Sequence, residues 1–337
     1  MMKKILKARE TTSFLFLAAL FLLVGIINPS FLTLSNISAC FNTSVVYTLI
    51  AVGMAFAIFV GEIDVSVGSN LGLVAAVVGT MIQNGSNWFA AFAVGICIGA
   101  VVGLINGWGV AVMKIPSLIF TLGTNGILRG MMYLQVGAEQ VNQLPKAFKD
   151  ISSMTLVGSF TIYYCCAVLL TLLIHALLTR TRKGRYFIAV GDNAGGAELV
   201  GIPATRTKVL AYVICGVLSA IGGIIFCSRI GIVTSLSGNG YEMKAVAACV
   251  LGGISLSGGV GSVIGAGIGA VIMASISYLL VFMQFPSNYD NAITGVILIT
   301  IVVLDALMQR RAAVNNRHAR LAARTSAAPG GKEAAEQ

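Results

Sequence analysis

Two carboxylates stand two residues apart inside an otherwise apolar part of the chain, at Glu62 and Asp64. Ionised groups are costly among apolar residues and are usually functional there, so this pair could relay a proton or bind a small cation. The same acids could instead be hydrated at an interface or cap the helix that follows them, because a helix N-terminus attracts negative charge. The residue types alone leave both the ion-relay and the structural interpretation open.

The segment that holds these acids, residues 61–68, has a counterpart 191 residues later, at 252–259. Gly, Ile, Ser and Gly recur at the first, third, sixth and eighth positions of both segments, and each segment interrupts an apolar run. Irregular backbone is tolerated within a membrane only where it faces protein or water, so matched interruptions in two halves of a chain point to a translocation pathway. Polarity and placement then select the side chains that we expect to line this pathway: Asp64, Ser66, Asn70, Thr121, Asn125, Ser255 and Ser257.

Other kinds of chemistry lack their sequence motifs. The chain has no G-x-x-x-x-G-K-[ST] phosphate loop, no H-E-x-x-H and no nucleophile elbow, so we expect it neither to hydrolyse ATP nor to catalyse a covalent reaction. Its seven cysteines are odd in number and lack metal-ligand spacing, so we interpret them as small apolar core residues and expect no metal site. The sequence therefore predicts a non-catalytic protein without a cofactor of its own.

The composition requires elements that cross a membrane. Hydrophobic residues make up 57% of the 337 residues and charged residues only 10%, against about 25% charged in a typical soluble domain. The mean hydropathy of +0.91 excludes a soluble enzyme or binding module. The apolar content suits about ten helices of roughly 20 residues, and the 39 glycines allow such helices to approach closely. The predicted fold is an all-α polytopic membrane protein of about ten transmembrane helices with glycine-rich interruptions.

Apolar runs place these helices along the chain. We predict spans at 13–28, 43–60, 68–83, 88–112, 115–135, 159–178, 207–229, 243–257, 262–283 and 289–307. They form one transmembrane domain over residues 1–310, and a basic cytoplasmic tail over 311–337 is expected to be disordered.

The net charge of +10 follows the membrane and does not indicate nucleic-acid binding. Ten spans with a cytoplasmic N-terminus put 17 of the 22 Lys and Arg residues inside and 5 outside, which satisfies the positive-inside rule. We therefore expect a multi-pass protein of the bacterial cytoplasmic membrane, in contact with lipid, with both termini in the cytoplasm. One basic residue, Arg129, falls inside the fifth apolar run, where it could snorkel, pair with an acid or touch a polar ligand.

The inner loop at 179–206 predicts a short helix on the cytoplasmic surface, over residues 191–202. Asp192 and Asn193 suit its N-cap, and Gly201 suits its C-terminal stop. Ala197 and Glu198 lie in the helical stretch between them, although an ordinary capped loop is the alternative. Because the chain has no motor of its own, a presented surface helix suggests a partner that supplies the energy.

In combination, these segments resemble the permease subunits of simple-sugar ABC importers, the group of the ribose, xylose, galactose and autoinducer-2 permeases. The likeness covers most of residues 45–300, and segment 242–255 looks most like the autoinducer-2 type. Glu62 departs from the pattern of the family, because many members carry glycine at this position. The segments that carry the resemblance are 61–69, 114–117, 121–124, 129–130, 191–202 and 247–261.

This resemblance implies a permease subunit that forms a translocation pathway in a homo- or heterodimer. The implied solute is a simple sugar or a sugar-like molecule of the pentose, deoxyhexose or autoinducer-2 type. The implied partners are a second permease subunit, a cytoplasmic ABC ATPase that binds ATP and Mg²⁺, and a periplasmic or lipid-anchored sugar-binding protein. Helix 191–202 would be the coupling helix that docks on the ATPase, with Asp192, Asn193, Ala197, Glu198 and Gly201 at the contact. Charged groups on the outer rim would help to dock the binding protein, and the candidates are Lys146, Lys149, Arg229 and Lys244.

A different class of transporter is the main alternative. In an ion-coupled secondary carrier, Glu62 and Asp64 would be the coupling groups. Such a carrier would take up its solute without a partner and without ATP. A non-transporting scaffold or receptor would need a sizeable soluble module, and the polar loops of this sequence are too short to form one.

Overall fold

The computed structural model describes residues 9–137, 140–286, 289–300 and 302–303. The lysines at positions 3, 4 and 7 and the predicted tail at 311–337 lie outside the described residues. The long helices are α2 (Arg9–Ile27), α3 (Leu34–Thr43), α4 (Val45–Phe59), α5 (Val67–Gln83), α6 (Trp88–Ala111), α7 (Ser117–Val136), α9 (Ile162–Arg180), α12 (Ala204–Ile230), α13 (Tyr241–Leu251) and α14 (Val263–Phe282). A further helical stretch covers residues 289–300.

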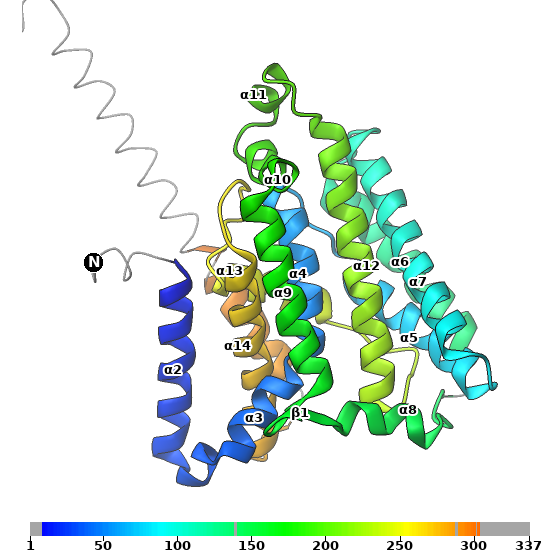
Figure 1. Cartoon of the computed structure of the whole chain (residues 1–337), viewed down its shortest axis with the longest axis vertical. Coiled ribbons are helices and arrows are strands. Elements are labelled where there is room, and N and C mark those ends of the chain that lie inside the picture. The colour runs from blue at the N-terminus through cyan, green and yellow to red at the C-terminus, as the bar shows by residue number, and fades with distance from the viewer. Residues whose placement is uncertain (1–8, 138–139, 287–288, 301, 304–337) are drawn as a thin grey trace, which may run out of the picture.

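Short elements connect these helices. They are η1 (Pro29–Leu32), α8 (Lys146–Asp150), η2 (Ile151–Ser153), β1 (Thr155–Val157), β2 (Phe160–Thr161), α10 (Arg182–Asp192) and α11 (Ala194–Leu199). The strands β1 and β2 pair antiparallel, so the all-α prediction needs one correction, a two-stranded hairpin. Figure 1 shows α10 and α11 at one end of the long helices and α8 with β1 at the opposite end.

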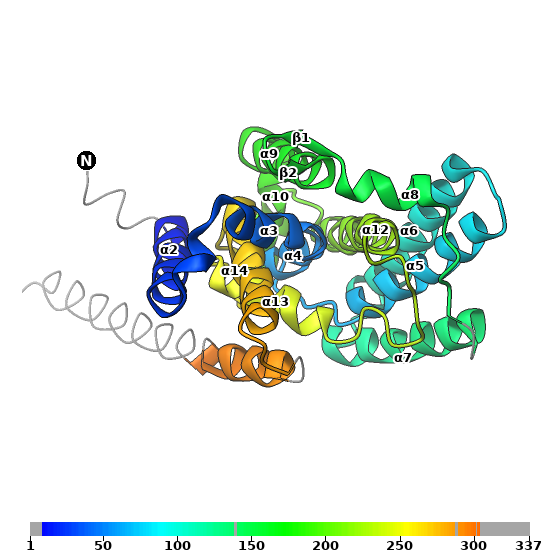
Figure 2. The same ribbon diagram turned by 90° about the horizontal axis from the view of Figure 1, so that it is seen from below.

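Helix α4 forms the centre of the protein. It is apolar on every side, and all of its residues are buried, as expected for a helix without a polar face. Its neighbour α12 lies beside it between α4 and α6 (Figure 2). Glycines let α6 and α12 approach closely, because a Cβ on Gly99 would lie only 2.4 Å from the carbonyl oxygen of Gly216.

Length and hydropathy qualify only part of the predicted spans as membrane helices. Among the described residues, α6, α9, α12 and α14 are long and apolar enough to cross a membrane. The pair α3 and α4, bent by 42° at Ser44, makes a fifth if it is counted as one span. Helices α2 and α5 are apolar but fall below the length or hydropathy of a full span.

Both predicted interruptions break the helices, although Val67 and Gly68 of the first one already belong to α5. Residues 60–66 separate α4 from α5, and residues 252–262 separate α13 from α14. The eighth predicted span, 243–257, therefore ends early, because helix α13 stops at Leu251. The following glycines have positive φ angles that a helix cannot accommodate, such as +82° at Gly253 and +85° at Gly258.

Candidate functional site

Asp64 is the centre of a buried hydrogen-bond network in the first interruption. Its side chain is 1% exposed, and its Oδ1 accepts hydrogen bonds from the backbone N–H of Ser66 at 2.9 Å and from the Ser66 hydroxyl at 2.6 Å. The Oγ1 of Thr121 on α7 accepts a hydrogen bond from the backbone N–H of Val65 at 3.1 Å. Three of the predicted pathway residues, Asp64, Ser66 and Thr121, are thus brought together.

Two members of this network were not predicted from the sequence. The Asn106 amide nitrogen on α6 donates to the Ser66 hydroxyl at 2.8 Å and lies 3.3 Å from Asp64 Oδ1. The Thr124 hydroxyl on α7 donates in turn to Asn106 Oδ1 at 2.8 Å. A lone Asn in an apolar helix was the available signal, because a polar amide buried between helices requires hydrogen-bond partners.

Glu62 does not share a site with Asp64. Its carboxylate forms an ion pair of 2.5 Å with Lys208 near the start of α12, and both side chains are partly exposed. Each acid therefore has its own partners, and the pair lacks a common cation site. This arrangement favours the structural interpretation of the two acids over the ion relay.

The remaining predicted pathway residues lie apart from this network. The Asn70 amide donates to the Gly216 carbonyl of α12 at 2.9 Å. Ser255 and Ser257 lie within 2.9 Å of each other in the second interruption, where Ser255 is buried and Ser257 is exposed. Asn125 is half-buried on α7. The side chains of the predicted set therefore divide into separate groups.

The two sequence-matched interruptions meet in space, next to the end of α10. The Gly259 N–H donates to the Phe59 carbonyl at 3.0 Å. A Cβ on Gly258 would lie 2.9 Å from the Gly61 nitrogen, and a Cβ on Gly191 would lie 1.7 Å from the Phe59 oxygen. No side chain fits where these three segments meet. We call this contact, formed by Gly61, Gly191, Gly258 and Gly259, the glycine junction.

The predicted surface helix needs two corrections. Residues 182–192 form a helix of their own, α10, because Phe187 and Val190 give this segment an apolar face that packs on α4. Asp192 is its last residue, whereas Asn193 does cap the next helix, its side chain accepting from the Gly196 N–H at 2.9 Å. The second helix, α11, is therefore shorter than predicted, and a left-handed Gly201 follows it.

The outward face of α11 also differs from the prediction. Ala197 is only 5% exposed because it packs on the chain itself, so it cannot lie on a surface offered to a partner. Leu199 and Val200 are 90% and 76% exposed, which makes them the apolar side chains presented at this end of the protein. Glu198 is exposed beside them.

Two of the four basic residues predicted to dock a partner are exposed. Lys146 and Lys149 lie on the surface of α8. Arg229 is half-buried, and its guanidinium donates to Thr43 at 3.1 and 3.2 Å, so it holds α12 to α3.

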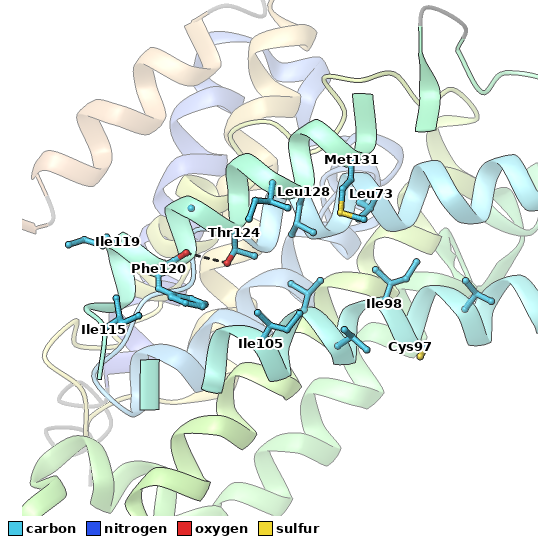
Figure 3. Close-up of a pocket in the computed structure, with 15 residues that line it drawn as sticks. Leu73, Cys97, Ile98, Ile105, Ile115, Ile119, Phe120, Thr124, Leu128 and Met131 are labelled. Atoms are coloured by element: carbon cyan, nitrogen blue, oxygen red, sulfur yellow. Dashed lines mark hydrogen bonds between the residues drawn. The ribbon is translucent and has the colours of Figure 1, made fainter. Parts of the chain in front are cut away.

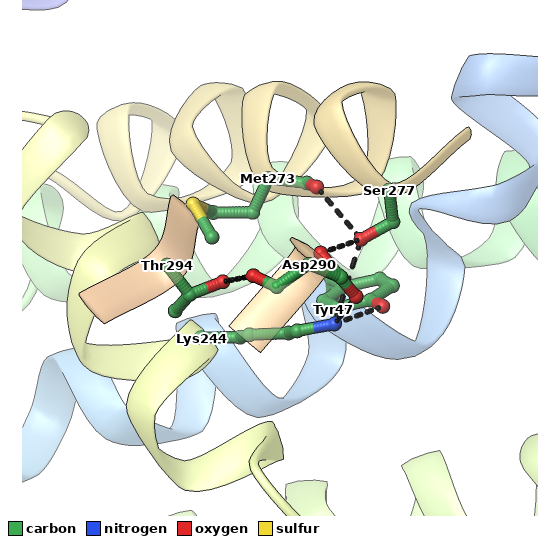
Figure 4. Close-up of polar contacts among 6 residues, drawn as sticks. All are labelled: Tyr47, Lys244, Met273, Ser277, Asp290 and Thr294. Carbon is green, nitrogen blue, oxygen red and sulfur yellow. Dashed lines mark hydrogen bonds and ion pairs between the residues drawn. The ribbon is translucent and has the colours of Figure 1, made fainter. Parts of the chain in front are cut away.

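The prediction for Lys244 is wrong, because its side chain is buried within the protein. The Lys244 ammonium forms an ion pair with Asp290, donates to the Tyr47 hydroxyl at 3.3 Å and lies 5.3 Å from the centre of that ring (Figure 4). Ser277 donates to the same carboxylate at 2.9 Å. This group ties α13 to the helical stretch at 289–300, and it leaves Lys244 unable to reach a partner.

A large cavity between α6 and α7 is unsuited to a polar solute. It has a volume of about 760 Å³ and is lined by Ile, Leu and Val side chains (Figure 3). Thr124 is the lone hydroxyl that lines it, and its single proton is already shared between Asn106 Oδ1 at 2.8 Å and the Phe120 carbonyl at 3.2 Å. A hydroxylated molecule would lose its hydrogen bonds to water here, so the cavity suits an apolar occupant.

Comparisons with known proteins agree on one family. Residues 36–302 match the family described as branched-chain amino acid transport system / permease component. A relative from Enterobacter sp. (strain 638), named autoinducer 2 import system permease protein LsrC, is 40% identical over 98% of this chain and 95% of its own length. Relatives of the same name from Klebsiella pneumoniae and Yersinia pseudotuberculosis are each 38% identical, over 98% and 92% of this chain and 95% and 88% of their own lengths. No solved structure gives a significant match.

Proposed function

Because the chain belongs to the branched-chain amino acid transport system / permease component family, we propose that it is the pathway-forming subunit of an ATP-driven importer for a sugar-like solute of the autoinducer-2 type. The observation that carries the choice of solute is the 40% identity, over nearly the whole chain, to permeases named for autoinducer 2 import. The family description names branched-chain amino acids, so it does not by itself select this solute.

The proposed assembly contains permease, ATPase and binding-protein subunits. This chain pairs with a second permease, which is either a copy or a paralogue. A cytoplasmic ABC ATPase binds ATP and Mg²⁺, and a sugar-binding protein delivers the solute from outside. The chain itself is a polytopic membrane protein, and we propose about ten crossings with both termini in the cytoplasm.

The proposed contact with the ATPase is the exposed tip of α11. Leu199 and Val200 offer an apolar surface there, and Asn193 fixes the start of the helix. Helix α10 directly precedes α11, and its Gly191 belongs to the glycine junction beside both interruptions. This continuity supports the proposal that movement of the ATPase reaches the pathway through α11 and α10.

Uptake in proteoliposomes tests the proposed function. The complex of this chain with its ATPase, second permease and binding protein should accumulate autoinducer 2 only when ATP is supplied. The pair Leu199→Asp and Val200→Asp should abolish this uptake and leave ATP hydrolysis by the free ATPase unchanged, because charge opposes burial of the apolar tip. The matched control is Thr179→Asp on the exposed end of α9, which should transport normally.

The same experiment separates the alternative. Uptake by this chain alone, driven by an ion gradient without ATP, would establish a secondary carrier and overturn the proposal. Normal uptake by the variant with Leu199→Asp and Val200→Asp would show that α11 does not contact the ATPase.

A further inference from the structure

The N-terminal ends of α5 and α13 meet near the middle of the protein. A Cβ on Gly68 would lie 2.1 Å from Glu242 Oε2 and 2.5 Å from the Gly238 carbonyl oxygen, so Glu242 rests against bare backbone at the start of α5. The neighbouring Val67 carbonyl accepts a hydrogen bond from Ser219, the sixteenth of the 27 residues of α12. The meeting point is therefore about halfway along the longest helix.

Polar atoms without partners converge on this point. Glu242 is 9% exposed, and its Oε2 accepts no hydrogen bond from any described residue. On α7, Arg129 donates from Nη1 to the Ser237 carbonyl at 2.8 Å, while its Nη2 is buried and has no acceptor among the described residues. The two charges interact electrostatically, yet within the described chain they do not form an ion pair.

Asn125 adds a second acceptor on the α7 side. It precedes Arg129 by one helical turn and lies on the same face of α7. Along α7, Thr121 contacts Val65 and Met132 contacts Gly72. Asn125 lies between these two contacts, one turn after Thr121, so it is placed at the height of Gly68 on α5. Its Oδ1 is buried and accepts no hydrogen bond in the described part of the chain.

We propose that Glu242, Arg129 and Asn125 form a recognition site for the transported solute. Buried polar groups are almost always hydrogen-bonded, so several unpartnered atoms around one point indicate a missing ligand. The group offers one donor and two acceptors, and each hydroxyl of a neutral polyhydroxylated molecule can both donate and accept. A charged solute would face an unfavourable charge from either Glu242 or Arg129, so the site favours a neutral one.

The glycines explain why this point is accessible to a solute when the helices separate. Gly68 and Gly238 carry no side chain between Glu242 and α5, so a small outward movement of α7 or α13 opens space beside the carboxylate. This inference rests on the proposed function and specifies where the permease contacts its solute.

The test compares autoinducer 2 with a set of its analogues in the complete importer. Uptake into proteoliposomes is measured for autoinducer 2 and for analogues that each lack one hydroxyl, with the binding protein saturated. We expect Glu242→Gln and Glu242→Ala to lower autoinducer 2 uptake about 10-fold, the scale of a lost hydrogen bond to a charged group. For one analogue the Glu242 variants should not lower uptake further, because this analogue lacks the hydroxyl that donates its hydrogen bond to Glu242. Arg180→Gln, an exposed charge at the end of α9, is the control that should keep the wild-type preference.

Two outcomes would overturn the site. One is unchanged uptake by the Glu242 variants, and the other is an equal loss for every solute with the preference retained, which indicates a structural role. If Glu242→Ala assembles poorly, Glu242→Gln tests the same side of the site with little change in volume, and Asn125→Ala tests the opposite side. Absence of autoinducer 2 uptake by the wild-type importer would instead refute the proposed function itself.

Discussion

Replacing Lys244 should destabilise the protein far more than replacing an exposed lysine. The Lys244 side chain is 7% exposed and that of its partner Asp290 is 20% exposed, so the pair lies largely away from water. The substitution Lys244→Ala removes the ion pair, the contact with Tyr47 and the positive charge near two aromatic rings. Among the described residues, it leaves the Asp290 carboxylate with the hydrogen bond from Ser277 to stabilise a partly buried negative charge.

The expected cost follows from that orphaned charge. Breaking a buried pair by removing one partner costs about 3–5 kcal/mol, whereas removing both partners with well-packed replacements is often close to neutral. Lys244→Met combined with Asp290→Asn should therefore be more stable than either single variant. Lys146→Ala, on the exposed α8, should change stability by less than about 0.5 kcal/mol.

Thermal unfolding of the purified protein in detergent measures this order. The melting temperature should fall most for the variants that replace Lys244 or Asp290 alone. It should recover in the double variant and stay unchanged for Lys146→Ala. Equal midpoints for Lys244→Ala and Lys146→Ala would refute the conclusion that Lys244 is a buried structural residue. A double variant less stable than both single variants would refute the role assigned to the orphaned charge.

Three further outcomes follow from contacts described above. Asn106→Ala removes donors to Asp64 and Ser66 and should cost about 1–3 kcal/mol in unfolding free energy, which the same melting assay detects. Gly191→Ala forces a Cβ to within 1.7 Å of a carbonyl oxygen and should abolish uptake, whereas Gly195→Ala, whose nearest neighbour is 3.6 Å away, should not. Lys146→Ala should weaken uptake by less than about 5-fold, and the difference should vanish at high salt, because exposed charge pairs contribute about 0–1 kcal/mol and are screened.

Hydropathy predicted the helical runs well because membrane helices must satisfy their own backbone groups. It also located both interruptions, since glycine and serine clusters are uncommon within long apolar runs. It could not show that the two interruptions touch each other, because a contact between 61–68 and 252–259 depends on how α4, α13 and α14 pack.

The errors at Lys244 and Asn106 have a common origin, which is that their partners are distant in the sequence. Counting basic residues by loop assigns Lys244 to a surface, but its acid partner is 46 residues later and no local pattern joins them. Asn106 was missed for the same reason, because its partners come from the first interruption and from α7. The sequence does not predict helix α10, because its basic residues and glycines are typical of a loop and only Phe187 and Val190 are large buried side chains.

The glycine junction has a consequence for how such permeases can diversify. Since main-chain atoms make the contact, its shape does not depend on which side chains surround it. Segment 182–201 can therefore be exchanged with that of a relative if Gly184 and Gly191 are kept and the buried side chains of Phe187, Val190 and Ala197 are matched. If α11 contacts the ATPase as we propose, a chimera of this kind works with the ATPase of the relative and still imports the original solute.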